Sequence, residues 1–167
     1  MKTLSLIQPW ASLVILGRKR YETRSWGVSY RGELAIHASK EFPRDCKLIT
    51  HRDPYAKLLE DVSILPLGAV LGIVRVVGVT RLVASCAVAE IGEKYNLAEL
   101  AIAETEADLA RVSDSHRAAR TLAITRDEHG VGDFSVGRFA WELEVLERFE
   151  KPIPAKGNRG LWDWRRP

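Results

Sequence analysis

The chain has 167 residues, of which 46% are hydrophobic and 28% are charged. This composition is typical of a globular protein and argues against a disordered chain, and the length suits one domain. No apolar run reaches the roughly 18–20 residues that a membrane-spanning helix needs, and the first apolar stretch is too short for a secretory signal, so we expect a cytoplasmic protein.

The net charge of +3 hides an uneven distribution along the chain. Residues 1–57 carry 11 Lys/Arg and 5 Asp/Glu, whereas residues 87–133 carry 5 Lys/Arg and 10 Asp/Glu. A basic N-terminal part suits an anionic partner, and an acidic segment repels one. A solvated surface of mixed charge is the alternative interpretation of the same excess.

The N-terminal elements are predicted from short apolar runs and the residues that interrupt them. Thr3–Ile7 reads as a strand, and Gln8-Pro9 opens a short helix, because proline at the first helical position loses no hydrogen bond. Gly17 is placed to end this helix in a left-handed cap. Two further strands are expected over Arg20–Trp26 and Glu33–Ser39.

The middle of the chain changes character. Residues 41–61 hold one or two short helices interrupted at Pro54, and Ala69–Val79 is a β-branched run typical of a central strand covered on both faces. In residues 85–125 alanine, glutamate and leucine dominate. We therefore predict two or three helices there, as an insertion rather than a second domain.

The C-terminal part returns to strand. Asp127–Gly132 is predicted as a loop, and Gly137–Phe149 as a strand whose alternation breaks at Leu146. Strands dominate the two ends and helices the middle, which fits an α+β fold, a mixed β-barrel with peripheral helices. Residues 1–167 are predicted to form a single domain.

The densest polar cluster is the segment GRKRYETRSW over residues 17–26. On a strand that begins at Arg20, the side chains of Arg20, Glu22, Arg24 and Trp26 share one face. Such a row suits phosphate binding by the guanidinium groups and base stacking on the indole. Lys19 suits a point charge for a phosphate, or a nucleophile or base. The alternative is a solvent-facing row in which Glu22 bridges its neighbours.

A second cluster lies in the tail segment KGNRGLW. Its two glycines allow backbone N–H groups to approach a ligand closely, so Lys156, Asn158 and Arg159 are candidate binding side chains. The alternative is a tight turn that delivers Leu161 and Trp162 to the core.

Metal and cofactor sites are not indicated. The four histidines and two cysteines are scattered, and the chain contains none of the CxxC, HxxxH or HExxH spacings. Neither a phosphate-loop nor a dinucleotide fingerprint occurs. We predict no metal and no cofactor.

Of the five tryptophans, Trp10, Trp141 and Trp162 have apolar neighbours and read as core residues, whereas Trp26 is the better stacking candidate.

Four stretches of the chain together resemble the ASCH domain family of the PUA-like superfamily. The G-x-K-x-x-E-x-R signature of that family appears as Gly17, Lys19, Glu22 and Arg24. The matching stretches are LSLIQPWASLVILGRKRYETRSW, YRGELAIHASK, PLGAVLGIVRVVGV and VGRFAWELEVLERFEKPIPAKGNRGLW. The QPWAS and KGNxGLW motifs make the chain similar above all to the group that contains the ASCH domain of a eukaryotic transcription coactivator.

The resemblance implies a PUA-like β-barrel of about five to seven mixed strands, with a basic cleft beside the first helix. It implies that this cleft binds a nucleic acid, RNA more than DNA, or a modified nucleotide. The expected contacts lie in the QPW turn, the basic strand and the tail: Gln8, Pro9, Trp10, Arg18, Lys19, Arg20, Tyr21, Glu22, Arg24, Trp26, Arg31, Lys156, Asn158 and Arg159.

Two alternatives stay open. Some relatives with this barrel are ribonucleases or amidohydrolases on N4-acetylcytidine, which implies a hydrolase in which Lys19 polarises the attacked group and Glu22 is the general base. In the amidohydrolases a threonine stands at the position of Glu22. The second alternative is a protein-interaction module that uses the acidic segment 87–125.

Overall fold

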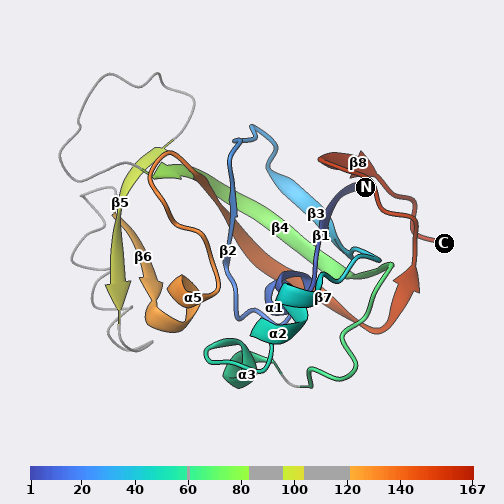
Figure 1. Ribbon diagram of the computed structural model, residues 1–167. Coiled ribbons are helices and arrows are strands. Elements are labelled where there is room, and N and C mark those ends of the chain that lie inside the picture. The colour runs from blue at the N-terminus through green and yellow to red at the C-terminus, as the bar shows by residue number, and fades with distance from the viewer. Residues whose placement is uncertain (60, 83–95, 104–120) are drawn as a thin grey trace. The chain divides into compact units, whose positions relative to one another are not determined.

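The computed structural model describes residues 1–59, 61–82, 96–103 and 121–167 (Figure 1). Its residues form two compact units. The first unit comprises Met1–Arg20, Arg31–Val76 and Leu143–Pro167, and the second comprises Tyr21–Tyr30 and Val77–Glu142. The single domain over residues 1–167 stays a prediction.

The strands form a mixed sheet in the order β2-β7-β4-β3-β1-β8. Their bounds are β1 Lys2–Leu6, β2 Tyr21–Arg24, β3 Gly32–Ala38, β4 Ala69–Leu82, β7 Phe139–Pro154 and β8 Leu161–Asp163. Beyond this path, β5 (Asn96–Ala103) pairs in parallel with the end of β4 and with β6 (Thr121–Thr125). The two long strands, β4 and β7, contribute residues to both units. A mixed sheet with short helices confirms the predicted α+β class.

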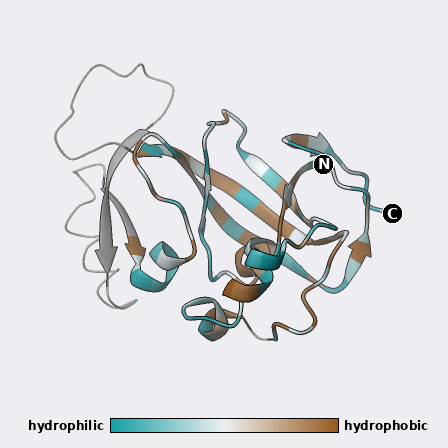
Figure 2. Ribbon diagram, viewed as in Figure 1, coloured by the Kyte–Doolittle hydropathy of each residue, from teal (hydrophilic) through white to brown (hydrophobic). Residues whose placement is uncertain are grey.

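The first unit is built on β1, β3 and β8. β1 pairs in parallel with β3 and antiparallel with β8, while β3 pairs antiparallel with β4. The residues Leu34 to Ala38 of β3 are all buried, because a central strand presents both faces to apolar neighbours. Figure 2 shows hydrophobic colour interrupted by hydrophilic positions along β3, and hydrophobic colour over much of β4. One hydrophobic core cluster of this unit consists of Ala35, Val70, Ile73, Phe149 and Trp164.

Three short helices belong to the first unit: α1 (Trp10–Ile15), α2 (Arg44–Ile49) and α3 (Tyr55–Leu58). Five of the six residues of α1 are buried, so packing rather than length stabilises this helix. Gly17 has a φ of 69° and ends the turn, as predicted. The two helices expected on either side of Pro54 are confirmed. None of the described helices is both long and apolar enough to cross a membrane.

The second unit corrects two predictions. Residues 96–103 and 121–125 are strands, so the helices predicted there are wrong, and the other residues of the predicted insertion lie outside the described ones. The loop expected over Asp127–Gly132 begins as a helical turn, α5 (Arg126–Gly130). The described core of this unit joins Tyr21, Leu82, Ile124, Phe134 and Ala140.

Candidate functional site

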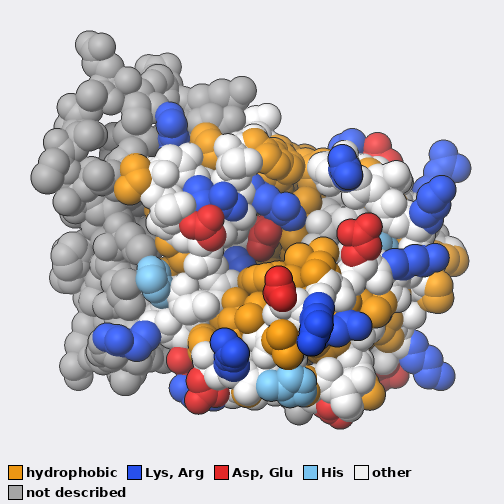
Figure 3. Space-filling view, in the orientation of Figure 1, with side chains coloured by type: hydrophobic (Ala, Val, Ile, Leu, Met, Phe, Trp, Pro, Cys, Tyr) orange, Lys and Arg blue, Asp and Glu red, His pale blue; other side chains and the backbone are white. Residues whose placement is uncertain are grey.

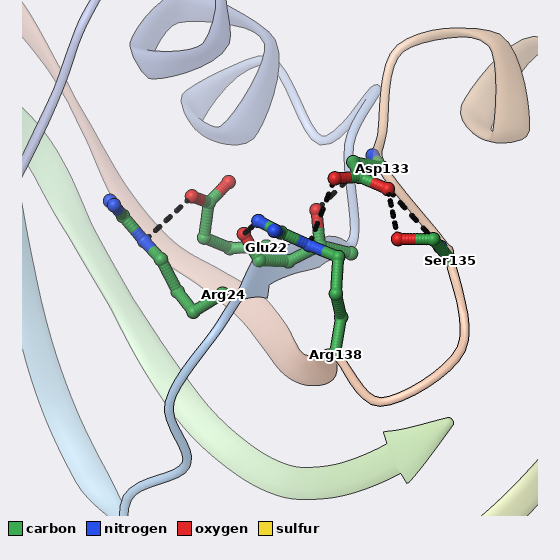
Figure 4. A network of polar contacts seen from close by, with 6 residues as sticks. Glu22, Arg24, Asp133, Ser135 and Arg138 are labelled. Atoms are coloured by element: carbon green, nitrogen blue, oxygen red, sulfur yellow. Dashed lines mark hydrogen bonds and ion pairs between the residues drawn. The ribbon is translucent and has the colours of Figure 1, made fainter. Parts of the chain in front are cut away.

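A buried carboxylate and a guanidinium lie next to each other on β2. β2 pairs antiparallel with the start of β7, so that Glu22 faces Trp141 and Arg24 faces Phe139 across the ladder. Glu22 is 6% exposed, and its Oε1 lies 3.0 Å from Nε of Arg24 (Figure 4). A buried carboxylate is costly without a partner, and this ion pair supplies one. The Arg24 side chain is 27% exposed, which places its charge where both Glu22 and solvent reach it.

The other side of β2 is tied to the loop before β7. Asp133 donates its backbone N–H to Thr23 Oγ1 at 3.2 Å, and Nη2 of Arg138 donates to the carbonyl of Thr23 at 3.2 Å. Asp133 and Arg138 form an ion pair at 3.1 Å (Figure 4). The hydroxyl of Ser135 and the charge of Arg138 lower the pKa of Asp133. The strand that carries Glu22 and Arg24 is therefore held from both the ladder and the loop.

Trp26 follows β2 and keeps a partly open indole. It is 36% exposed, and its ring meets that of Trp141 edge to face, with 4.7 Å between centroids and 86° between planes. Trp141 is fully buried and donates its Nε1–H to the carbonyl of Trp26 at 3.3 Å. The buried indole thus fixes the exposed one, which suits Trp26 for stacking on a base.

A second buried carboxylate, Glu128, was missed by the sequence reasoning. It is 3% exposed, and its Oε1 accepts the backbone N–H of Tyr21, the first residue of β2, at 2.8 Å. Thr125 caps α5 by accepting the N–H of Glu128 at 3.1 Å. The signal was present in the sequence, because Thr-x-x-Glu is the signature of a helix start.

The QPW turn has a structural role in the first unit. Gln8 is fully buried, and its amide donates to the carbonyl of Pro66 at 2.8 Å and accepts the N–H of Ser12 at 3.1 Å. Pro9 is buried, and the ring of Trp10 meets that of Tyr55 edge to face. These contacts fix the start of α1. That Gln8, Pro9 and Trp10 also contact a ligand stays a prediction.

Lys19 is unusually buried for a lysine, at 2% exposure. It follows the turn at Gly17, and its backbone N–H donates to the carbonyl of Leu13 at 3.1 Å. Burial of an ammonium is costly, which marks Lys19 as more than a solvent-facing charge. The other predicted binding residues near Lys19 vary in exposure. Arg18 and Arg31 are exposed, Arg20 is half-buried and Tyr21 is buried.

A cavity of about 300 Å³ lies in the first unit beside α1. Its walls are mostly apolar and include Ile15 and Leu16 of α1, Leu71 of β4 and Phe149 of β7. None of the predicted binding residues lines it. The basic cleft expected beside the first helix therefore stays a prediction.

The tail presents its polar residues outward. Lys156, Asn158 and Arg159 are exposed, and Gly160 adopts a φ of 66°. Trp162 is half-buried against the apolar cluster of the first unit. The segment is thus a turn that leads into the core and also leaves its cations in solvent.

Charges of both signs reach the surface. On the face that Figure 3 shows, Lys/Arg side chains stand among Asp/Glu side chains, with hydrophobic side chains between them. Across the described ranges, no group of three or more His, Cys, Asp or Glu residues is arranged to hold a metal ion.

Comparison with known proteins gives a family. The ASCH domain model matches residues 4–153. A segment of 78 residues is 40% identical to Activating signal cointegrator 1 of Homo sapiens and 38% identical to that of Mus musculus. The matched segment covers 44% of this chain but only 13% of each relative, so the chain corresponds to a small part of those proteins. On the family match over most of its length, this chain belongs to the ASCH domain family.

Proposed function

We propose that the chain binds RNA, with Arg24 contacting phosphate and Trp26 stacking on a base. The observation that supports this most is the conjunction on β2 of a partly exposed guanidinium, anchored by a buried carboxylate, with a partly exposed indole two residues further on. Guanidinium groups bind phosphate oxygens with two parallel hydrogen bonds, and an indole stacks on any base. The membership in a family with a PUA-like fold supports the same class of ligand.

The anchoring of Arg24 matters for this role. The ion pair with Glu22 involves Nε of the Arg24 guanidinium and so orients this group. A guanidinium that is already oriented loses less side-chain entropy when it binds a phosphate. Arg18 and Arg31 are exposed cations on the same chain and add to its attraction for phosphates.

Anisotropy of a labelled single-stranded RNA tests the proposal. We expect binding at low salt with an affinity that falls as salt rises, because phosphates release counterions when they are neutralised. Trp26→Ala should weaken binding by about 1–3 kcal/mol, the usual value of one stacked base, whereas Trp26→Phe should retain most of the affinity. Absence of binding at low salt, or equal affinity of the alanine variant and the native chain, would overturn the proposal.

A hydrolase is the second candidate, and the burial of two ionisable side chains favours it. Lys19 and Glu22 are three residues apart in the sequence and are 2% and 6% exposed. Groups that perform general acid–base chemistry are commonly sheltered from water. Incubation with RNA and with N4-acetylcytidine, followed by product chromatography, tests this. Turnover that survives both Lys19→Ala and Glu22→Ala rules out the assigned roles.

A further inference from the structure

A buried histidine lies at the base of the C-terminal tail in the first unit. His37 on β3 is 1% exposed and stands opposite Ser5 of β1 in the parallel register. Its Nε2 lies 3.1 Å from the carbonyl oxygen of Ala155, and its Nδ1 lies 3.1 Å from Oγ of Ser5. A carbonyl only accepts, so Nε2 carries the hydrogen and Nδ1 accepts from the Ser5 hydroxyl.

Trp162 continues this chain of hydrogen bonds. Its Nε1–H donates to Ser5 Oγ at 3.0 Å, and its ring stands edge-on to the imidazole, with 5.6 Å between centroids. Ala155 and Trp162 flank the tail loop, which we define as residues 156–160. Both ends of this loop are therefore tied to one imidazole, the first directly and the second through Ser5.

The middle of the tail loop lies against the same ring. A Cβ on Gly157 would stand 2.4 Å from Cε1 of His37 and 3.0 Å from Oγ of Ser5, so no other residue fits without displacement. With the glycine held inward, Lys156 and Asn158 on either side of it, and then Arg159, are exposed. The loop thus combines a fixed backbone with two outward cations and an amide.

We propose that the tail loop contacts RNA phosphates, and that His37, Ser5 and Trp162 are positioning residues for it. The inference rests on the proposed function, because the ligand is the one assigned to β2. Lys156 and Arg159 supply the charge and Asn158 supplies amide donors. A loop held in place before binding loses less conformational entropy on binding, which makes the buried chain of hydrogen bonds useful for affinity.

The charge of the loop is tested by salt dependence. Labelled oligouridine is titrated with the native chain and with Lys156→Ala/Arg159→Ala at several KCl concentrations. Two lost phosphate contacts should make the slope of log K against log salt shallower by about 1.4, at roughly 0.7 per contact on a single strand. The matched control is Lys151→Ala/Arg165→Ala, which removes two exposed cations of the same unit outside the loop; we expect it to keep the native slope.

The outcomes separate the two proposals. If the native chain does not bind oligouridine, the proposed function fails. If it binds, and the loop variant has the slope of its control, the tail loop makes no phosphate contact and only this inference fails.

The positioning role is tested by a double-mutant cycle. If His37 acts through the loop, His37→Ala should lower affinity, and adding Lys156→Ala/Arg159→Ala to it should have little further effect. Full additivity of the two effects would overturn the positioning role. Gly157→Ala is a second test of the positioning role, because it keeps the imidazole and every charge but displaces the loop backbone. We expect this variant to have a shallower slope of log K against log salt than the native chain. The thermal unfolding curve of each variant is recorded first, so that every titration is done at a temperature at which the variant is folded.

Discussion

At the scale of single residues, what distinguishes this chain is the burial of polar groups with assigned partners. Glu22, Glu128 and His37 each have a named hydrogen-bond or ion-pair partner inside the fold. A buried polar group contributes little when it is satisfied and costs much when its partner is removed. Substitutions of the partners should therefore be more informative than substitutions of exposed charges.

The ion pair between Glu22 and Arg24 predicts a difference between two arginines. Arg24→Ala leaves a buried carboxylate without this partner and should lower the free energy of unfolding by about 1–3 kcal/mol. The matched control is Arg75→Ala, which breaks an ion pair of the same 3.0 Å length to Glu144 between exposed side chains; it should cost about 0–1 kcal/mol. Urea denaturation measures both values, and equal losses would contradict the assigned burial.

His37 predicts a pH dependence of stability. Burial lowers its pKa from the ordinary 6.5, against a smaller opposing effect of the Ala155 carbonyl. The unfolded chain therefore binds the proton more readily than the folded one, and stability falls as pH decreases below about 6.5. Chemical denaturation between pH 8 and pH 5 should show this decline, and His37→Gln should remove the part that belongs to the imidazole. A variant with the native pH profile would show that another group titrates.

At the scale of elements, close packing explains where glycine is required. On β4, a Cβ at Gly72 would lie 2.2 Å from the carbonyl oxygen of Glu147 on β7 and 3.0 Å from Ile15 of α1. Because Gly72 has no side chain, β7 and α1 both pack closely against it. This close packing and the hydrogen bond from the Ser12 N–H to Gln8 together hold a helix of only six residues in place.

Gly72→Ala should consequently be costly. We expect a loss of about 1–3 kcal/mol in the free energy of unfolding, because backbone atoms must move to admit the methyl group. Gly78→Ala on the same strand is the control, since its Cβ would meet mainly the flexible carboxylate of Glu142. Thermal or urea unfolding compares the two, and a neutral Gly72→Ala would show that the helix and the strand separate easily.

Elements also show where sequence patterns fail. The segment NLAELAIA over residues 96–103 is rich in helix-forming residues, yet it forms β5, which pairs in parallel with two other strands. Pairing partners far away in the sequence override local propensity, and no local pattern reports them. The strands at the two ends of the chain were predicted because their β-branched and alternating residues agree with their surroundings.

At the scale of the whole molecule, the fold class was predictable and the site was predictable only in part. The glycine signals at 17 and 160 and the placement of Glu22 beside Arg24 on β2 are local and can be read from the sequence, although Arg20 and Trp26 of the predicted row lie outside β2. The burial of Lys19 and the hydrogen bond from Tyr21 to Glu128 depend on where distant segments meet. The sequence therefore indicates β2 itself, whereas the carboxylate of Glu128 that accepts from its first residue comes from a distant segment.

The perpendicular indoles of Trp26 and Trp141 have an optical consequence. Their centroids are 4.7 Å apart, close enough for their electronic transitions to couple, and one ring is sealed inside while the other meets solvent. The near-ultraviolet circular dichroism of the chain should therefore contain a signal from this pair, and the proposed stacking of a base on Trp26 should change that signal. A titration followed at these wavelengths tests the proposed stacking without any label.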